Sequence, residues 1–271
     1  MSTAPKPLYR ILLTGDWHCG DKAGLTPQSH WKAAGKYRKL AEKLWNWFET
    51  TVKENGPYDF TIFTGDMTEG ANSKNTIELF ECDTEEQALI AVECAKIIPC
   101  KPENMRCVYG TPFHTAGTYS YENIFAKELG MPKPRTIQRL TVRNLVRLNV
   151  KHTAGRSGIP YGQGTPTLKE LINEMLAAMR QGDTPADIVI RGHTHISISV
   201  RLENKESISV PCLKYPDSVF GRKLQESQYD MGIGILDIYG DKDWVYRPIL
   251  IPLKISQPRE WENIGGQNGK K

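Results

Sequence analysis

Residues 188–195 have the sequence IVIRGHTH, in which a short apolar run passes directly into a Gly-His-x-His turn. The run is typical of a buried strand, and His193 and His195 follow at its end. Imidazole is the commonest metal-binding side chain, and two imidazoles one residue apart can reach neighbouring positions of one metal ion. Taken alone, the pattern fits a metal site and a surface turn about equally well.

Four other segments place an aspartate or a histidine after an apolar run. They are Gly15-Asp16-Trp17-His18, Gly65-Asp66, Gly110-Thr111-Pro112-Phe113-His114 and Val150-Lys151-His152. Of the six histidines in the sequence, only His30 lies outside these segments and the Gly-His-x-His turn. Open α/β sheets bind ligands outside the carboxyl ends of their strands. The sequence therefore predicts one site, built by strand ends that are far apart along the chain.

The composition is that of a soluble globular protein, because 271 residues with 39% hydrophobic side chains are ample for a core. The net charge of +4 tolerates an anionic substrate but is too small to indicate a dedicated nucleic-acid surface. No apolar run approaches the roughly 20 residues that span a bilayer, and residues 1–7 lack an apolar signal region. We therefore expect a cytoplasmic protein that does not bind a membrane. The oligomeric state is left open.

The six cysteines form no C-x-x-C pair, and free thiols are expected in a reducing compartment. Cys19 stands beside His18 and is a weaker candidate for a soft metal ligand.

The hydrophobic pattern predicts an α/β fold. Apolar runs predict strands at 8–14, 59–64, 104–109, 145–150 and 187–191. Apolar residues at three- and four-residue steps predict helices at 30–55, 83–98, 119–129 and 165–181. Short β segments at 196–202, 207–210, 232–238 and 244–247 then predict an antiparallel finish. We expect a single domain over residues 1–256 and a disordered tail over 257–271.

Three details of these elements are also predicted. Asp83 or Thr84 caps the helix that follows, with Leu89 on its inner face. The helix at 165–181 should bury one apolar face, made of Leu168, Leu171, Ile172, Met175, Leu176 and Met179. If the extended backbone of the first strand continues, Asp16 and His18 point to the same side.

Two aspartates and several histidines at one edge suit a site for two metal ions. Carboxylate oxygen and imidazole nitrogen suit Mn²⁺, Fe²⁺, Zn²⁺ or Ni²⁺. Two such ions about 3.5–4 Å apart need a shared ligand, acidify a trapped water and clamp an in-line displacement at phosphorus. Cleavage of a phosphate ester is the reaction that benefits most.

The motifs Asp16-x-His18, Gly65-Asp66, Gly110…His114, His152 and Gly192-His193-x-His195 occur in the order of a known pattern. In this respect the chain resembles the calcineurin-like metallophosphoesterases over about residues 8–200. The resemblance implies a four-layer α/β/β/α sandwich, in which two mixed β-sheets pack face to face and helices lie outside.

The resemblance also implies a role for each motif residue. Asp16, His18 and His195 would bind the first metal, His152 and His193 the second, and Asp66 would bridge the two. His114 would protonate the leaving oxygen or stabilise the transition state, and a metal-bridging hydroxide would attack. The implied cofactor is a pair of divalent ions, with Mn²⁺ the first choice and Fe, Zn or Ni as alternatives.

The third motif departs from the family pattern Gly-Asn-His. The asparagine that binds the second metal is missing, and two extra residues separate Gly110 from His114. The Thr111 hydroxyl, a water or the His114 ring could take the vacant position, and His114 could also be only a loop residue. The Gly-Thr-x-x-His variant is similar to phage-encoded members of the family, which would act in the host cytoplasm.

Other residues near the motifs have two interpretations each. Arg156 contacts a phosphate or is solvated, and Trp17 stacks on a base or packs beneath the site. Tyr119 and Tyr121 are candidate pocket residues. Lys214 and Asp217 are interpreted as ordinary polar residues of a late loop.

The leading functional hypothesis is a binuclear-metal phosphodiesterase that hydrolyses a nucleotide or nucleic-acid phosphodiester, for example a 2′,3′-cyclic nucleotide. A DNA exo- or endonuclease of the repair-nuclease branch is the second enzyme hypothesis. A protein phosphatase is weaker, because Met67-Thr68-Glu69-Gly70 follows Asp66 where that branch has an arginine signature. A non-catalytic scaffold remains the alternative from a different class.

Overall fold

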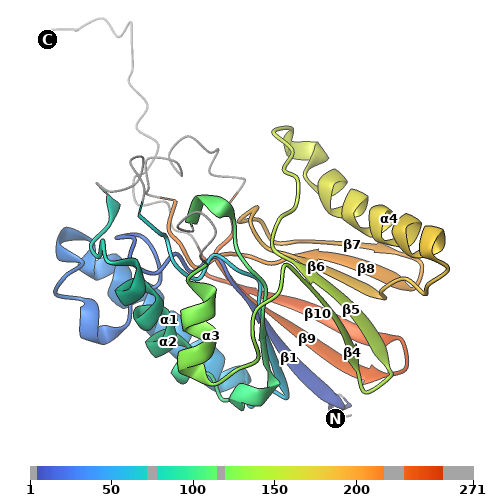
Figure 1. The fold of residues 1–271 in the computed structure, drawn as a ribbon, viewed down its shortest axis with the longest axis horizontal. Helices are drawn as coiled ribbons and strands as arrows, with labels where there is room; N and C mark the ends of the chain where they lie inside the picture. Colours follow the sequence, from blue (N-terminus) through green and yellow to red (C-terminus); the bar gives the residue numbers. More distant parts are fainter. Residues whose placement is uncertain (1–4, 72–77, 115–119, 217–228, 253–271) are drawn as a thin grey trace, which may run out of the picture.

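Two five-stranded sheets packed face to face form the centre of the fold in the computed structural model (Figure 1). The structure describes residues 5–71, 78–114, 120–216 and 229–252. The helices α1 (Arg38–Asn55), α2 (Thr84–Lys96) and α3 (Glu122–Leu129) lie outside the first sheet. The helix α4 (Gly164–Gln181) lies outside the second. The predicted four-layer α/β/β/α arrangement is therefore confirmed.

Both sheets are mixed. The first has the order β10-β9-β1-β2-β3, with β1 parallel to β2, β2 parallel to β3, and β9 antiparallel to both β1 and β10. Its strands are β1 (Tyr9–Thr14), β2 (Phe60–Phe63), β3 (Met105–Cys107), β9 (Gly232–Gly240) and β10 (Asp243–Leu250). The parallel strands β1, β2 and β3 therefore end at the same edge of this sheet.

The second sheet has the order β4-β5-β6-β8-β7, in which β5, β6 and β8 are parallel and the two edge strands are antiparallel. Its strands are β4 (Ile137–Val142), β5 (Val146–Lys151), β6 (Ile188–Arg191), β7 (Ile198–Leu202) and β8 (Lys205–Ser209). The predicted antiparallel finish is thus only partly correct, because β8 pairs in parallel with β6.

Side-chain alternation along β1 explains why two layers of core exist. Ile11 and Leu13 join the cluster between the sheets, whereas Leu12 joins the cluster beneath the helices, and all three are fully buried. A strand places successive side chains on opposite faces, so a central strand covered on both faces must be apolar throughout. The continuous run Ile11–Leu13 meets that requirement.

Several element boundaries follow local chemistry. The Asp83 side chain caps α2 by accepting hydrogen bonds from the backbone N–H groups of Glu85 and Glu86, as predicted. The predicted helix at 30–55 is wrong in its first part, since 28–30 and 35–37 are short 3₁₀ turns and α1 begins at Arg38. Gly35 has a φ of +57°, which a continuous α-helix does not allow.

The prediction for the inner face of α4 is only partly correct. Ile172 and Leu176 are each 41% exposed and Met179 is 69% exposed, whereas Leu171 and Ala178 are buried. Leu89 on α2 is likewise 41% exposed. The strand β4 was not predicted at all. Within the described ranges, no helix combines the length and the apolar character needed to cross a membrane.

Candidate metal centre

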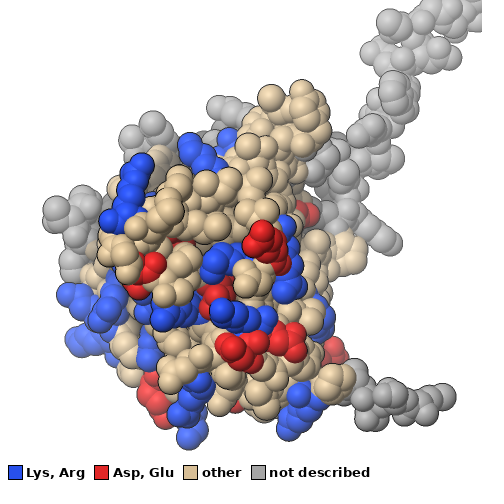
Figure 2. All heavy atoms as spheres, turned by 90° about the vertical axis from the view of Figure 1, so that its right-hand side faces the viewer, with Lys and Arg blue, Asp and Glu red and all other residues tan. Residues whose placement is uncertain are grey.

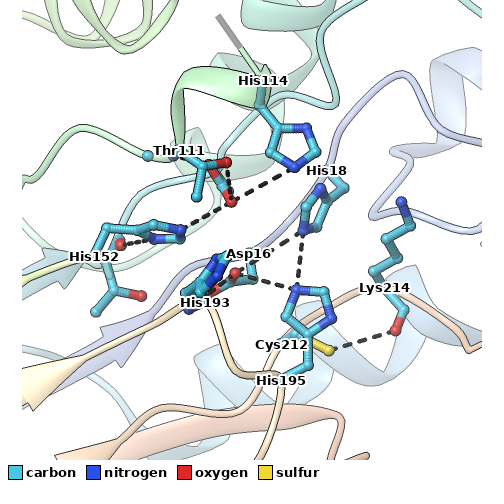
Figure 3. Close-up of polar contacts among 12 residues, drawn as sticks. Asp16, His18, Thr111, His114, His152, His193, His195, Cys212 and Lys214 are labelled. Carbon is cyan, nitrogen blue, oxygen red and sulfur yellow. Dashed lines mark hydrogen bonds and ion pairs between the residues drawn. The ribbon is translucent and has the colours of Figure 1, made fainter. Parts of the chain in front are cut away.

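Five strand ends deliver the predicted site residues to one place (Figure 3). Asp16 and His18 follow β1, Asp66 follows β2, and Thr111 and His114 follow β3. His152 follows β5 of the other sheet, and His193 and His195 follow β6. Figure 3 shows the side chains of Asp16, His18, His114, His152, His193 and His195 directed toward one region, and Asp66 lies close to His152 and His193. The prediction that distant strand ends build a common site agrees with this geometry.

Most of the predicted metal ligands have a strained backbone. Positive φ angles occur at Asp16 (49°), His18 (50°), Asp66 (51°), His193 (70°) and His195 (56°). The left-handed conformation costs a non-glycine residue roughly 1–2 kcal/mol, and such residues concentrate at functional sites. The expectation that Asp16 and His18 continue an extended strand is therefore wrong, although both side chains reach the same cluster.

Backbone hydrogen bonds between neighbouring strand ends hold this conformation. The N–H of Asp16 donates to the carbonyl of Gly65 at 2.9 Å, and the N–H of His18 donates to that of Asp66 at 3.1 Å.

Glycine is required where the loops approach most closely. A Cβ on Gly110 would lie 2.0 Å from Oδ1 of Asp66, and one on Gly192 would lie 2.7 Å from Oδ2 of Asp16.

The first-metal cluster consists of Asp16, His18 and His195, whose ligand atoms all lie within 4.8 Å of one another. Nε2 of His195 is 3.2 Å from both Oδ1 of Asp16 and Nε2 of His18. Ligands bound to one ion at about 2.0–2.2 Å are separated by distances of this size.

Hydrogen bonds on the far side of each ring decide which nitrogen carries the proton. Nδ1 of His18 lies 2.7 Å from the Glu69 carboxylate, which can only accept, so Nδ1 carries the proton. The Tyr229 hydroxyl donates to the carbonyl of Lys214 at 2.6 Å and so accepts from Nδ1 of His195 at 3.0 Å. In the neutral rings both Nε2 atoms therefore present lone pairs to each other, which fits a shared cation.

The second-metal cluster consists of Asp66, His152 and His193. Nδ1 of His152 donates to the carbonyl of Thr64 at 2.6 Å, which leaves Nε2 directed at the site. This buried Nε2 has no hydrogen-bond partner, although Oδ2 of Asp66 is only 2.9 Å away. This approach is that of an ion pair when the ring is protonated, and it fits two ligands of one ion when the ring is neutral. The His193 ring is the exposed member.

Burial and neighbouring charges shift the pKa values of the site. Burial, with Lys214 acting in the same direction, lowers the pKa of His18 to about 4. Burial opposes the charged form of His152, but Asp66 and Asp16 outweigh it and raise its pKa to about 9. Burial likewise opposes the charged form of His195, whereas Cys212 and Asp16 raise its pKa to about 10. In the metal-free protein, protons on these two rings compensate the buried aspartates.

The described residues of the third motif contact Asp66 and Glu69. The N–H of Thr111 donates to Oδ1 of Asp66 at 2.6 Å, and its hydroxyl lies 3.3 Å from both carboxylate oxygens. Thr111 therefore orients Asp66. Nδ1 of His114 donates to the carbonyl of Glu69 at 2.5 Å, and its Nε2 lies 3.7 Å from Oδ2 of Asp66. The His114 ring thus faces the site.

Trp17 packs beneath the site and does not stack on a ligand. It is fully buried against Phe48, Phe63 and Phe125, and its indole N–H donates to the Thr14 hydroxyl at 2.7 Å. Of the two interpretations of Trp17, the structural one is therefore correct.

The remaining candidate site residues differ in burial. Arg156 is half-buried in the loop after His152, and burial lowers its pKa. Tyr121 and Cys19 are buried, and Cys19 belongs to the core beneath the helices. Tyr119, Asp217 and the predicted tail at 257–271 lie outside the described residues.

Sequence reasoning missed the residues that support the first-metal cluster, and it misjudged Lys214. Lys214 is buried, with its ammonium 2.8 Å from Glu69 and 3.0 Å from Asp21. Glu69 contacts His18, and Tyr229 contacts His195. The only signal for Glu69 was its place three residues after Asp66; Tyr229 gave none.

No family model matches the sequence, and no curated protein matches it either. Solved structures with a related fold include an archaeal phosphodiesterase, at 15% identity and a TM-score of 0.48, covering 89% of this chain and 99% of that one. Vps29 from Chaetomium thermophilum has 13% identity and a TM-score of 0.43, with 89% and 97% covered. Vps29 from Entamoeba histolytica, complexed with zinc, has 12% identity and a TM-score of 0.41, with 89% and 98% covered.

At these identities the similarity concerns the fold and not the activity. The four layers, and the ordered motifs that meet at the strand ends, agree with the arrangement implied by the resemblance to the calcineurin-like metallophosphoesterases.

Proposed function

We propose that the protein is a metal-dependent phosphodiesterase that holds two divalent ions, with Mn²⁺ the first choice. The observation that carries the proposal is the convergence of ligand atoms from five strand ends into two clusters, in each of which the atoms lie within 4.8 Å of one another. Nε2 of His18 faces Nε2 of His195, and Nε2 of His152 faces Oδ2 of Asp66. Buried polar atoms need a partner, and in these contacts either a proton or a cation can supply it.

The donor set fits the proposed ions. Each cluster supplies one carboxylate and two imidazoles, a set that suits Mn²⁺, Fe²⁺, Zn²⁺ and Ni²⁺. When bound, a pair of such ions acidifies water and neutralises charge on phosphoryl oxygens. Asp66, held by Thr111, is the ligand proposed to bridge the two ions. The residues themselves bind the ions, orient the ester and supply a proton.

His114 is proposed to supply that proton to the leaving oxygen. Because its Nδ1–H is committed to the carbonyl of Glu69, only Nε2 faces the site. The acidic form is the imidazolium, whose Nε2–H points toward the cluster that contains Asp66. Since the neutral ring would instead offer a lone pair, His114 can alternatively complete the second metal site.

One feature favours a diester over a monoester. A monoester dianion needs more positive charge than a diester monoanion, and the buried ammonium of Lys214 is already paired with Glu69 and Asp21. Among the described residues near the motifs, Arg156 is the candidate contact for the phosphate. On the face drawn in Figure 2, basic and acidic side chains are interspersed, so that face shows no single-sign surface of the kind that indicates nucleic-acid binding.

The test uses protein stripped with a chelator and reloaded with Mn²⁺. We expect turnover of bis-p-nitrophenyl phosphate and of a 2′,3′-cyclic nucleotide to exceed turnover of p-nitrophenyl phosphate at least tenfold. Asp66→Asn should remove more than 99% of the activity. Faster hydrolysis of the monoester would contradict the diesterase assignment, and faster hydrolysis of single- or double-stranded DNA would favour the nuclease alternative. Metal binding without turnover of any of these esters would favour a non-catalytic scaffold.

A further inference from the structure

We infer that Lys214 is a positioning residue that fixes both histidines of the first-metal cluster in the tautomer that binds a cation. Nothing in the ordered motifs includes this residue. The inference rests on the proposed function, because it concerns the first of the two proposed ions. It is carried by two separate chains of hydrogen bonds that start from Lys214 and end on different rings.

The side-chain connection runs through Glu69. Nζ of Lys214 lies 2.8 Å from Oε2 of Glu69, and the same oxygen lies 2.7 Å from Nδ1 of His18. The ammonium keeps Glu69 ionised, so the carboxylate accepts the proton of Nδ1. The lone pair of His18 is thereby left on Nε2, the atom that faces the cluster.

The main-chain connection runs through Tyr229. The carbonyl of Lys214 accepts the Tyr229 hydroxyl proton at 2.6 Å, which orients the hydroxyl oxygen as an acceptor for Nδ1 of His195 at 3.0 Å. The lone pair of His195 is then left on Nε2 as well. Partners of this kind on the far nitrogen of a ligand histidine fix its tautomer and orientation.

The third member of the cluster contacts the same segment. The N–H of Leu213 donates to the carbonyl of Asp16 at 3.1 Å. The two residues 213 and 214 therefore support all three members of the first-metal cluster. This support comes from residues 213 and 214 of the segment that follows β8, and neither residue belongs to the ordered motifs.

Lys214 also lies against a further group of potential ligands. His18, Glu69 and His114 form a third group whose atoms are close enough to hold an ion. The ammonium of Lys214 lies against the carboxylate of this group and is anchored by Asp21 at 3.0 Å on its other side. The fixed ammonium supplies the positive charge there, so divalent ions are directed to the two clusters described above.

The experiment measures binding of Co²⁺ to chelator-stripped protein by calorimetry and by the visible absorption of the bound ion. Lys214→Met removes the side-chain connection and keeps the main-chain carbonyl, whereas Tyr229→Phe removes only the main-chain connection. Lys205→Met is the matched control, because Lys205 is another partly buried lysine, 3.4 Å from Asp187 and away from the site. Lys214→Met leaves the carboxylates of Asp21 and Glu69 buried without the ammonium. We therefore also compare Asp21→Asn with the double variant Asp21→Asn, Lys214→Met, in which one of these negative charges is removed.

We expect Lys214→Met and Tyr229→Phe each to weaken binding of the tighter Co²⁺ ion about 10- to 100-fold and to change its absorption spectrum. Lys205→Met should leave the affinity and the spectrum unchanged. If Lys214→Met does not fold, the Asp21→Asn pair and Tyr229→Phe decide the question. Affinities within twofold of the wild type with an unchanged spectrum would overturn the role of Lys214. Absence of Co²⁺ binding to the wild type would instead overturn the proposed metal centre and, with it, this inference.

Discussion

At the scale of single residues, the site depends on which nitrogen of each imidazole carries a proton. His18, His152 and His195 each direct Nδ1 to an acceptor outside the site, and all three direct Nε2 into it. A ring oriented in this way binds a cation readily and tolerates another lone pair poorly. The metal-free protein must therefore hold protons where the ions would bind.

Binding of the ions should release protons. The pKa values of His152 and His195 are raised to about 9 and about 10, so both rings are protonated in the metal-free protein at pH 7.5. A bound ion has to displace these protons, so the affinity should increase as the pH rises toward these values. Calorimetric titrations with Mn²⁺ in two buffers of different ionisation enthalpy measure the release. An enthalpy that is independent of the buffer would contradict the prediction.

The close approach of Gly110 to Asp66 can be tested by mutation. In Gly110→Ala the new Cβ would lie 2.0 Å from Oδ1 of Asp66, so the carboxylate proposed to bridge the ions must move. We expect turnover of bis-p-nitrophenyl phosphate to fall at least 100-fold. Gly158→Ala is the matched control, because a Cβ there meets no atom within 4 Å. Equal activities for the two variants would show that the position of Asp66 does not matter.

The leaving group distinguishes the two roles proposed for His114. If the ring supplies a proton, His114→Ala should slow esters with poor leaving groups, such as cyclic nucleotides, far more than p-nitrophenyl esters. If the ring instead binds the second ion, all esters should slow equally, and added Mn²⁺ should partly restore the rate. Rates on both classes of ester, measured at two Mn²⁺ concentrations, separate these outcomes.

At the scale of elements, α4 shows how a helical pattern can suggest the wrong face. The helix has apolar residues over a wide arc, and only the part that includes Leu171 and Ala178 is buried. The part with Leu176 and Met179 is turned away from β6, β7 and β8, which α4 contacts. Apolar periodicity identifies a helix but does not tell which part of a wide apolar arc meets the sheet.

Substitutions on the two faces of α4 should differ in their effect on stability. Leu171→Ala removes a fully buried side chain and should cost about 2–5 kcal/mol of unfolding free energy. Leu176→Lys, on the exposed face, should change the unfolding free energy by less than about 0.5 kcal/mol. Urea denaturation of both variants measures the difference. A large loss for Leu176→Lys would mean that this face is covered in solution.

At the scale of the whole molecule, the site is built between the two sheets and links them. β1, β2 and β3 of the first sheet and β5 and β6 of the second each end at the candidate metal centre. Ions held there would connect residues separated by up to 179 positions, as in the contact between Asp16 and His195. Occupancy of the site should therefore affect global stability.

Removal of the ions should lower the melting temperature. Ions that bind the folded state alone stabilise it by about 2.7 kcal/mol at one hundred times their dissociation constant. Thermal unfolding with Mn²⁺ and with excess chelator measures the shift, which should disappear in a double variant Asp16→Asn, Asp66→Asn. A chelator effect that persists in this double variant would place the stabilising ions elsewhere.

The sequence by itself determined the fold class and the residues that meet at the site. Alternating apolar runs and helical stripes are local patterns, and a parallel strand followed by a polar turn delivers its side chains to a predictable edge. For this reason the sequence alone identified Asp16, Asp66, His152 and His195 as candidate site residues. Their roles as metal ligands stay a prediction.

Only the tertiary structure decided what surrounds these residues. Lys214 and Glu69 are 145 positions apart, and no local pattern indicates that they pair. The same holds for Tyr229 beneath His195 and for Trp17, whose burial depends on helices from other parts of the chain. Hydrogen-bond partners, tautomers and buried charges depend on packing between distant segments, which a linear pattern does not encode.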